Sequence, residues 1–175
     1  MKATRKIVFL AVLVSIAIIF SFIDKYMSSF LFPMLPGAKI GLANIVILLV
    51  IMNFDLKDGL IVTGLKSVIV GLIFSGLTTF FIGGAASLVS FFVMFGLAKL
   101  ATHHMSYIGI SLVGSFCHSF IQLFMIMILY SIGFEVFIYG IYLLLLSIFS
   151  GLLIGILSIK LNKPLSNLIG TYNNW

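Results

Sequence analysis

Two polar residues at the start of a strongly apolar stretch are the first candidates for chemistry. The sequence Pro36-Gly-Ala-Lys39-Ile-Gly-Leu-Ala-Asn44 leads into a run of seven aliphatic residues. The Pro-Gly pair predicts a break, and the apolar residues after it predict a helix over 38–52. Backbone N–H groups and the helix dipole favour an anion at a helix N-terminus, so we expect Lys39 to bind an anion there. Asn44 lies inside the apolar run, where a polar side chain needs a partner.

Three further polar residues lie inside apolar stretches. His118 and Gln122 fall one turn apart on the same face of a predicted helix over 107–132. They are candidates for ligand binding, although hydrogen bonds to each other or between helices could satisfy them without a ligand. Lys66, in a predicted helix over 59–77, either snorkels to an interface or points into the bundle or toward a ligand. The candidate substrate-binding residues are Lys39, Asn44, Lys66, His118 and Gln122.

The composition predicts an all-α integral membrane protein. Hydrophobic residues make up 62% of the chain and charged residues 8%, with a mean hydropathy of +1.33, and soluble domains do not reach such values. A span needs roughly 20 residues, so the chain accommodates about six helices in a single membrane domain over 1–175. The predicted helices are 5–23, 38–52, 59–77, 79–101, 107–132 and 135–159.

The sequence lacks the motifs of several enzyme classes. It has no Walker A sequence for nucleotide hydrolysis and no Asp-Asp-x-x-Asp sequence that would hold magnesium on a diphosphate. All four carboxylates, Asp24, Asp55, Asp58 and Glu135, are expected in turns, which leaves none in a span to couple transport to protons or sodium. We therefore predict no catalytic residues, no cofactor and no enzymatic activity, and we expect a ligand with an anionic or acceptor-rich head.

Other residue types exclude further functions. The net charge of +6 is scattered and forms no basic stripe with interleaved aromatics, so nucleic acid is not an expected partner. Cys117 is the only cysteine, which excludes a disulfide framework. His103 and His104 are adjacent but have no cysteine or carboxylate companions, so no metal site is expected.

The positive charges predict the orientation in the membrane. Short cytoplasmic loops carry the excess of lysine and arginine. With both termini inside, Lys25 and Lys39 lie outside, and Lys66 lies within the membrane. The remaining basic residues then lie on the cytoplasmic side; they are Lys2, Arg5, Lys6, Lys57, Lys99, Lys160 and Lys163.

Two segments are expected to make specific contacts. Ala11 and Ser15 are small residues four apart in the first helix, a spacing that allows close approach of another helix, either within the bundle or from a partner. Residues 24–37 are predicted to form an irregular outside connection, and its length is typical of either a lid over a binding site or a disordered segment.

The sequence from Pro36 to Asn44, the intramembrane Lys66, the Gly83-Gly84 pair and His118-x-x-x-Gln122 resemble the membrane family called heptaprenyl diphosphate synthase component I. That family is similar to the substrate-binding S components of energy-coupling-factor transporters. The resemblance implies a six-helix S component of the cell membrane that captures a small micronutrient or cofactor precursor from outside. It also implies docking on a transmembrane T component with two ATPase subunits, through an Ala-x-x-x-Ala motif that reads Ala11-x-x-x-Ser15 here.

A second hypothesis follows from the family's name. The chain could be a non-catalytic accessory subunit of an isoprenoid diphosphate synthase, or a small membrane enzyme that uses Lys66 and His118. Copurification with T and ATPase subunits, as opposed to a prenyl synthase, discriminates between the hypotheses. Mass spectrometry of a copurified small molecule would identify the ligand.

Overall fold

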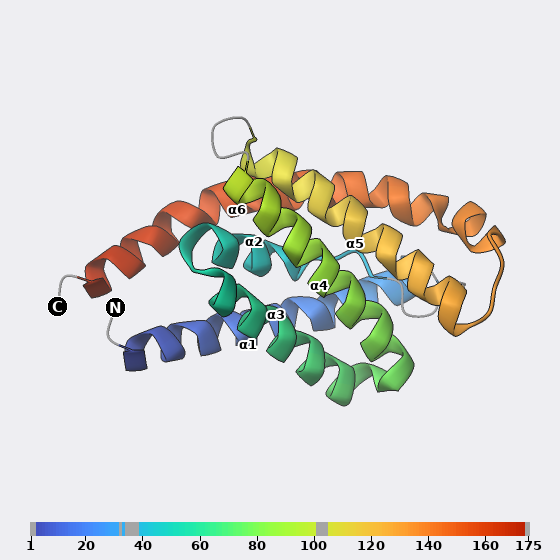
Figure 1. Ribbon diagram of the computed structural model, residues 1–175, viewed down its shortest axis with the longest axis horizontal. Coiled ribbons are helices and arrows are strands. Elements are labelled where there is room, and N and C mark those ends of the chain that lie inside the picture. The colour runs from blue at the N-terminus through green and yellow to red at the C-terminus, as the bar shows by residue number, and fades with distance from the viewer. Residues whose placement is uncertain (1–2, 32, 34–38, 101–104, 174–175) are drawn as a thin grey trace.

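The structure, a computed structural model, describes residues 3–31, 33, 39–100 and 105–173. These residues form helices and connecting turns, and no strand occurs among them (Figure 1). A single π-helical turn, η1, joins α3 to α4. The elements are α1 (Ala3–Leu31), α2 (Asn44–Asn53), α3 (Leu56–Val70), η1 (Gly71–Ser75), α4 (Gly76–Leu100), α5 (Tyr107–Leu129) and α6 (Glu135–Asn173).

Four helices are long and apolar enough to cross a membrane. These spans are Thr4–Leu31, Gly76–Leu100, Tyr107–Leu129 and Gly140–Gly170. Their outer surfaces expose large aliphatic and aromatic side chains, whereas serines and several other polar residues are buried inside the bundle. An apolar exterior around a partly polar interior suits a lipid environment. The chain is therefore a multi-pass membrane protein.

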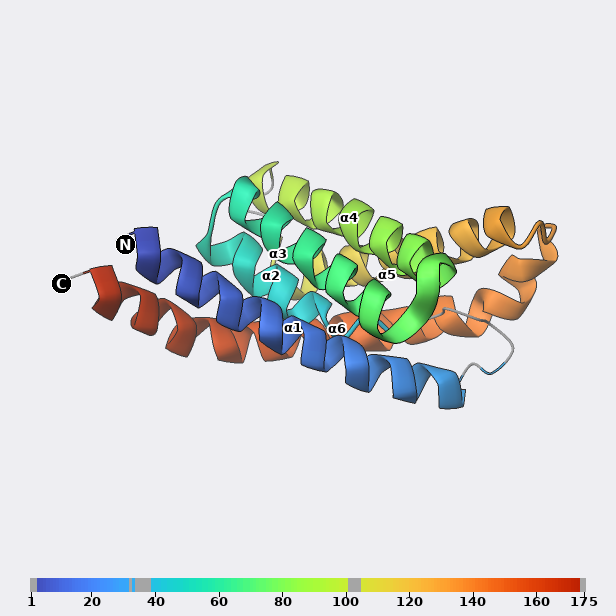
Figure 2. The ribbon, with the colours of Figure 1, turned by 90° about the horizontal axis from the view of Figure 1, so that it is seen from below.

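The expected number of six spans is not shown. α2 has only 10 residues and is too short to cross a bilayer. α3 has 15 residues and continues into the π-helical turn η1. In Figures 1 and 2, α2 begins near the middle of the bundle and runs back toward the end where the N-terminal part of α1 lies.

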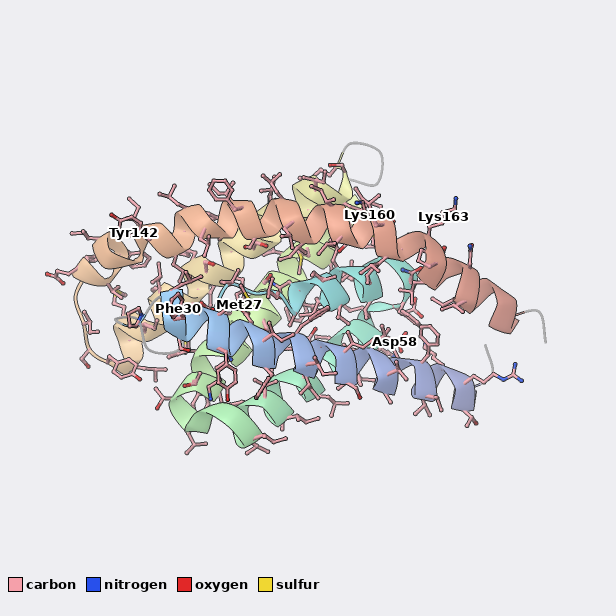
Figure 3. All side chains as sticks on the ribbon, turned by 180° about the vertical axis from the view of Figure 1, so that it is seen from behind. Met27, Phe30, Asp58, Tyr142, Lys160 and Lys163 are labelled. Atoms are coloured by element: carbon pink, nitrogen blue, oxygen red, sulfur yellow. The ribbon has the colours of Figure 1, made fainter. Side chains whose placement is uncertain are left out.

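The elements alternate between two ends of the molecule. The start of α1, the α2–α3 turn and the C-terminal end of α6 lie at one end, and the turn at η1 and the α5–α6 turn lie at the other (Figures 1 and 2). Figure 3 shows Asp58, Lys160 and Lys163 toward the first end and Phe30 and Tyr142 toward the second. This places the basic end of α6 beside the start of α1.

Close helix contacts depend on glycines. A Cβ atom at Gly155 would lie 2.7 Å from the Cα of Ile108, and one at Gly151 would lie 2.9 Å from the Cα of Leu112. Ser111 Oγ donates a hydrogen bond of 2.8 Å to the carbonyl of Gly151 at the same contact. Glycine is thus required where α5 and α6 touch through their backbones.

The irregular connection expected over 24–37 is wrong for residues 24–31, because α1 continues as a helix to Leu31. Asp24 and Ser28 lie one turn apart on the buried face of this extension, and Ser28 Oγ donates to Asp24 Oδ1 at 3.2 Å. The contacts of this face stabilise a helix that the local sequence does not favour. Residues 34–38, with the predicted break at Pro36, lie outside the described residues, as does residue 32.

Other helix boundaries differ from the expected ones for similar reasons. α3 begins at Leu56 because Asp58 Oδ2 accepts a hydrogen bond of 3.3 Å from the backbone N–H of Asp55, just before the helix. Asp58 also forms an ion pair of 2.8 Å with Lys6. α4 starts earlier and α6 ends later than expected, whereas α5 and α6 begin at the expected residues, Tyr107 and Glu135.

Candidate functional site

Four of the five predicted site residues line one cavity in the middle of the bundle. They are Lys39, Asn44, Lys66 and His118, and they come from the segment before α2, from α2 itself, from α3 and from α5. The cavity volume is about 20 Å³, which corresponds to roughly one water molecule. The rest of the wall is small or aromatic and includes Ser67, Gly71, Thr79, Phe80, Gly83, Gly84 and Ser87.

The segment before α2 is held by a buried carboxylate. Asp24 is 2% exposed, and its two oxygens accept backbone hydrogen bonds from Ile40 at 2.9 Å, Gly41 at 2.8 Å and Leu42 at 3.3 Å. These bonds hold the segment on a path where Gly41 has φ +95°, outside the α-helical region, so the segment stays non-helical until Asn44. Asp24 therefore fixes the path of the backbone that carries Lys39.

This arrangement corrects two expectations. Lys39 does not lie at a helix N-terminus, since α2 begins five positions later at Asn44. The expectation that every carboxylate falls in a turn is also wrong. Asp24 is buried within α1, and Asp58 is buried in the first turn of α3. The signal that could have found Asp24 is its helical spacing to Ser28, a second polar residue on the same face.

Gln122 supports the cavity from behind instead of lining it. Its side-chain Oε1 accepts a hydrogen bond of 2.9 Å from the backbone N–H of Lys39. Its Nε2 lies 2.9 Å from Nε2 of His118, so the amide donates and the imidazole accepts. Gln122 thus joins the segment before α2 to α5 and orients the His118 ring, which faces the cavity.

Two lysine side chains reach the cavity from different elements. Lys66 is 5% exposed, and its Nζ donates a hydrogen bond of 2.8 Å to Ser87 Oγ of α4. The Lys39 ammonium lies against Gly83, where an added Cβ would be 3.4 Å from Nζ. Within the described part of the chain no carboxylate lines this cavity. The wall therefore presents two ammonium groups to a small enclosed space, which favours an anion.

Asn44 supplies an unpaired amide at the same place. It is 1% exposed, and neither its Nδ2 nor its Oδ1 has a hydrogen-bond partner among the described residues. Gly41 packs closely here, with φ +95°, and a Cβ on it would lie 3.1 Å from Asn44 Nδ2 and 3.4 Å from His118 Cδ2. A buried amide without partners costs free energy unless something binds to it. Asn44 is thus a polar group directed at the cavity and available to a ligand.

The small residues of α1 divide between two faces. Ala17 and Ser21 are buried against the bundle, and Ser21 also lines the cavity. Ala11 and Ser15 are exposed, and the Ser15 hydroxyl bonds back to the carbonyl of Ala11 at 3.0 Å. The Ala11 and Ser15 face is therefore not used for packing within the described bundle.

No group of three or more metal-binding side chains occurs in the residues that the structure describes. His103 and His104 lie outside those residues. The polar groups at the cavity are two ammonium groups, an amide, an imidazole and hydroxyls. This donor-rich set suits an anion better than a metal ion.

Comparison with known proteins gives one match. The sequence profile of the family described as heptaprenyl diphosphate synthase component I matches residues 13–161. This range contains all five predicted site residues and the buried Asp24. No curated protein and no solved structure matches the chain.

Proposed function

The chain belongs to the family described as heptaprenyl diphosphate synthase component I, and from this premise we propose that it is the substrate-binding membrane subunit of an energy-coupling-factor-type importer. The observation that carries the proposal is the central cavity. Lys39 and Lys66 face it together with the unpartnered amide of Asn44. Such a set binds an anionic or acceptor-rich head group of a micronutrient or cofactor precursor.

The same cavity favours binding over catalysis. Its described wall offers no carboxylate, which a diphosphate-processing enzyme needs for magnesium. Asp24, the buried carboxylate that binds the segment after Lys39, already accepts hydrogen bonds from three backbone N–H groups and from Ser28. The two ammonium groups and the amide N–H groups can donate hydrogen bonds to an anionic group without transferring a proton. We therefore propose capture and release of an unmodified ligand.

We also propose that both termini face the cytoplasm and that the ligand enters from outside. Lys160 and Lys163 lie toward the same end as the start of α1, where Lys6 pairs with Asp58 (Figure 3). An excess of basic residues at one end is typical of the cytoplasmic side. Ser28 is buried, so the test uses a cysteine introduced at the neighbouring exposed Ser29, and labelling of it only from the cytoplasm would contradict this orientation.

Energy for uptake would come from partners, since the sequence has no nucleotide-binding motif of its own. The exposed Ala11 and Ser15 face of α1 is the proposed docking surface for a transmembrane T component that two ATPase subunits drive. Small exposed residues at this spacing allow a second helix to approach closely.

The experiment is affinity purification of the chain from its native membrane, followed by identification of copurified proteins and small molecules by mass spectrometry. We expect a T component, ATPase subunits and an anionic ligand. A purification that yields a prenyl synthase instead would favour a second candidate, an accessory membrane subunit of an isoprenoid diphosphate synthase. The description of the family is the observation that keeps this candidate in view.

A further inference from the structure

A second pocket adjoins the central cavity, the one lined by Lys39 and Lys66, on the side of the π-helical turn; we call the central cavity the cationic cavity below. It has a volume of about 270 Å³ and is lined by Val68, Gly71, Leu72, Gly76, Leu77 and Phe80. These residues carry no charged or hydrogen-bonding side chain. Leu72 is 75% exposed and Leu77 is 72% exposed, so the pocket opens toward the lipid-facing surface. Space of this kind fits an apolar chain.

The two spaces share a wall. Gly71 and Phe80 line both the cationic cavity and the apolar pocket. The Phe80 ring packs directly on the backbone of Gly71, so closely that a Cβ there would collide with it. Phe80 is thus the partition between a polar space and an apolar one, and a change in its rotamer would join them.

The backbone at this wall is irregular in a way that leaves room. η1 is a π-helical turn over Gly71–Ser75, and it ends at Gly76, whose φ is +71°. π-helical turns are rare and frequently occur at functional sites. Gly76 adopts this φ without strain because it has no Cβ atom, and the missing side chain of Gly71 makes room for the Phe80 ring.

Resting on the proposed function, we propose that the ligand is a single-chain amphiphile. Its compact anionic head binds Lys39, Lys66 and Asn44, and its apolar chain passes Phe80 into the pocket beside η1 and out toward the lipid. The cavity alone has room for roughly one water molecule, and the Phe80 ring forms part of its wall. The apolar pocket supplies the additional space that the head cavity lacks.

The charge balance supports an anionic head on this ligand. Lys39 and Lys66 are both buried, and Asp24 is the buried carboxylate of α1 that binds the segment after Lys39. Both Asp24 oxygens already accept backbone N–H groups. One carboxylate against two ammonium groups in this part of the bundle leaves a net positive charge, which one anionic group would neutralise.

The test uses the full-length protein in nanodiscs of zwitterionic lipid, with ³²P-labelled decyl phosphate as the tailed probe and inorganic phosphate as the head alone. Val68→Phe fills the apolar pocket without touching the cavity. Val113→Phe is the matched control, because Val113 lies on α5 in neither pocket and is 40% exposed against 42% for Val68. Both variants must retain the wild-type melting temperature, and Leu77→Trp replaces Val68→Phe if that variant fails to fold.

We expect Val68→Phe to weaken decyl phosphate binding about tenfold relative to Val113→Phe, since steric exclusion of a few methylene groups has this size. Inorganic phosphate should bind both variants equally. Equal binding of decyl phosphate by the two variants would overturn the inference. So would binding of decanol as tight as that of decyl phosphate, or displacement of bound decyl phosphate by a two-chain anionic phospholipid. None of these three results affects the copurification test, so the proposed function would stand or fall separately.

Discussion

Two regions of this molecule use small and polar residues in opposite ways. At the α5–α6 contact, Ser111 closes a hydrogen bond on Gly151, and Gly155 lets the two backbones touch. At the central cavity, Asn44 has no partner within the described chain and Lys66 donates to a single serine. In the first region the polar groups are satisfied within the protein, as in a structural contact. In the second region a buried polar group lacks a partner among the described residues, as in a binding site without its ligand. The difference teaches that polar residues in a span are informative only once their partners are known.

The largest effect on stability and binding is expected at Asp24, because it joins α1 to the segment that carries Lys39. Asp24→Asn removes the charge and replaces one accepting oxygen with an NH₂ group that faces backbone N–H donors. Hydrogen bonds to a charged group contribute about 1.5–3 kcal/mol each, so we expect the variant to lose roughly 3 kcal/mol of stability and measurable ligand binding. Thermal unfolding in detergent micelles measures the first and equilibrium binding the second. Glu135→Gln is the control, because that carboxylate is exposed; equal melting temperatures would contradict the role of Asp24.

The next variant separates binding from stability. Lys39→Met keeps an unbranched apolar side chain close to the length of the lysine stem but removes the charge, while the backbone N–H bond to Gln122 is retained. Loss of a charge-assisted hydrogen bond of about 1.5–3 kcal/mol predicts a roughly ten- to hundredfold weaker affinity. Binding of decyl phosphate in nanodiscs is the measurement, and Lys160→Met, at an exposed lysine, is the control. If both the affinity and the melting temperature stayed unchanged, Lys39 would contribute neither to ligand binding nor to stability, which would contradict the prediction.

A third variant perturbs the structural contact and leaves the cavity alone. Gly155→Ala places a methyl group 2.7 Å from the Cα of Ile108, and overpacking of this kind costs about 1–3 kcal/mol. The melting temperature should fall while ligand affinity remains. Gly64→Ala is the matched control, since nothing lies within 4 Å of a Cβ there and alanine favours a helix. A similar response of the two variants would show that the α5–α6 contact tolerates displacement.

The smallest effect on the protein itself is expected on the outer face of α1. Ala11→Phe adds a bulky group at an exposed position, so folding and ligand binding should stay at the wild-type level. Assembly with the proposed T component and uptake should be abolished, because a close helix contact cannot form. Copurification measures assembly. Loss of folding and binding together would show that this face packs within the protein's own bundle.

The sequence predicted the helical class and the grouping of polar residues better than it predicted helix ends. Lys39, Asn44, Lys66 and His118 could be named because a polar residue in an apolar span is conspicuous wherever the span lies. The structure brings these four to one cavity, and their binding of a ligand stays a prediction. Gln122 was named for the same reason, although it supports the cavity without lining it.

The missed features depend on contacts between distant segments. Asp24 reads locally as the end of an apolar helix, next to a lysine and ahead of two prolines. Its role follows from backbone N–H groups at Ile40 and Gly41, 16 and 17 positions away. Gly41 on this segment has φ +95°, which is outside the α-helical region, so residues 40–42 do not join α2 and the predicted start of that helix was wrong. No local pattern encodes hydrogen bonds between a side chain and a backbone segment this far along the chain.

The bonds of Asp24 also have a mechanical consequence. α1 carries the proposed docking face at one part of its length and holds the segment of Lys39 through Asp24 at another. A shift of α1 along its axis would therefore displace the Lys39 backbone and alter the cavity. By thermodynamic linkage, a partner that lowers ligand affinity through this shift must itself be bound less tightly when ligand is present, by the same factor. Asp24 would then couple ligand binding to partner docking. The strength of this coupling would be one free energy, which disfavours the state with both ligand and partner bound.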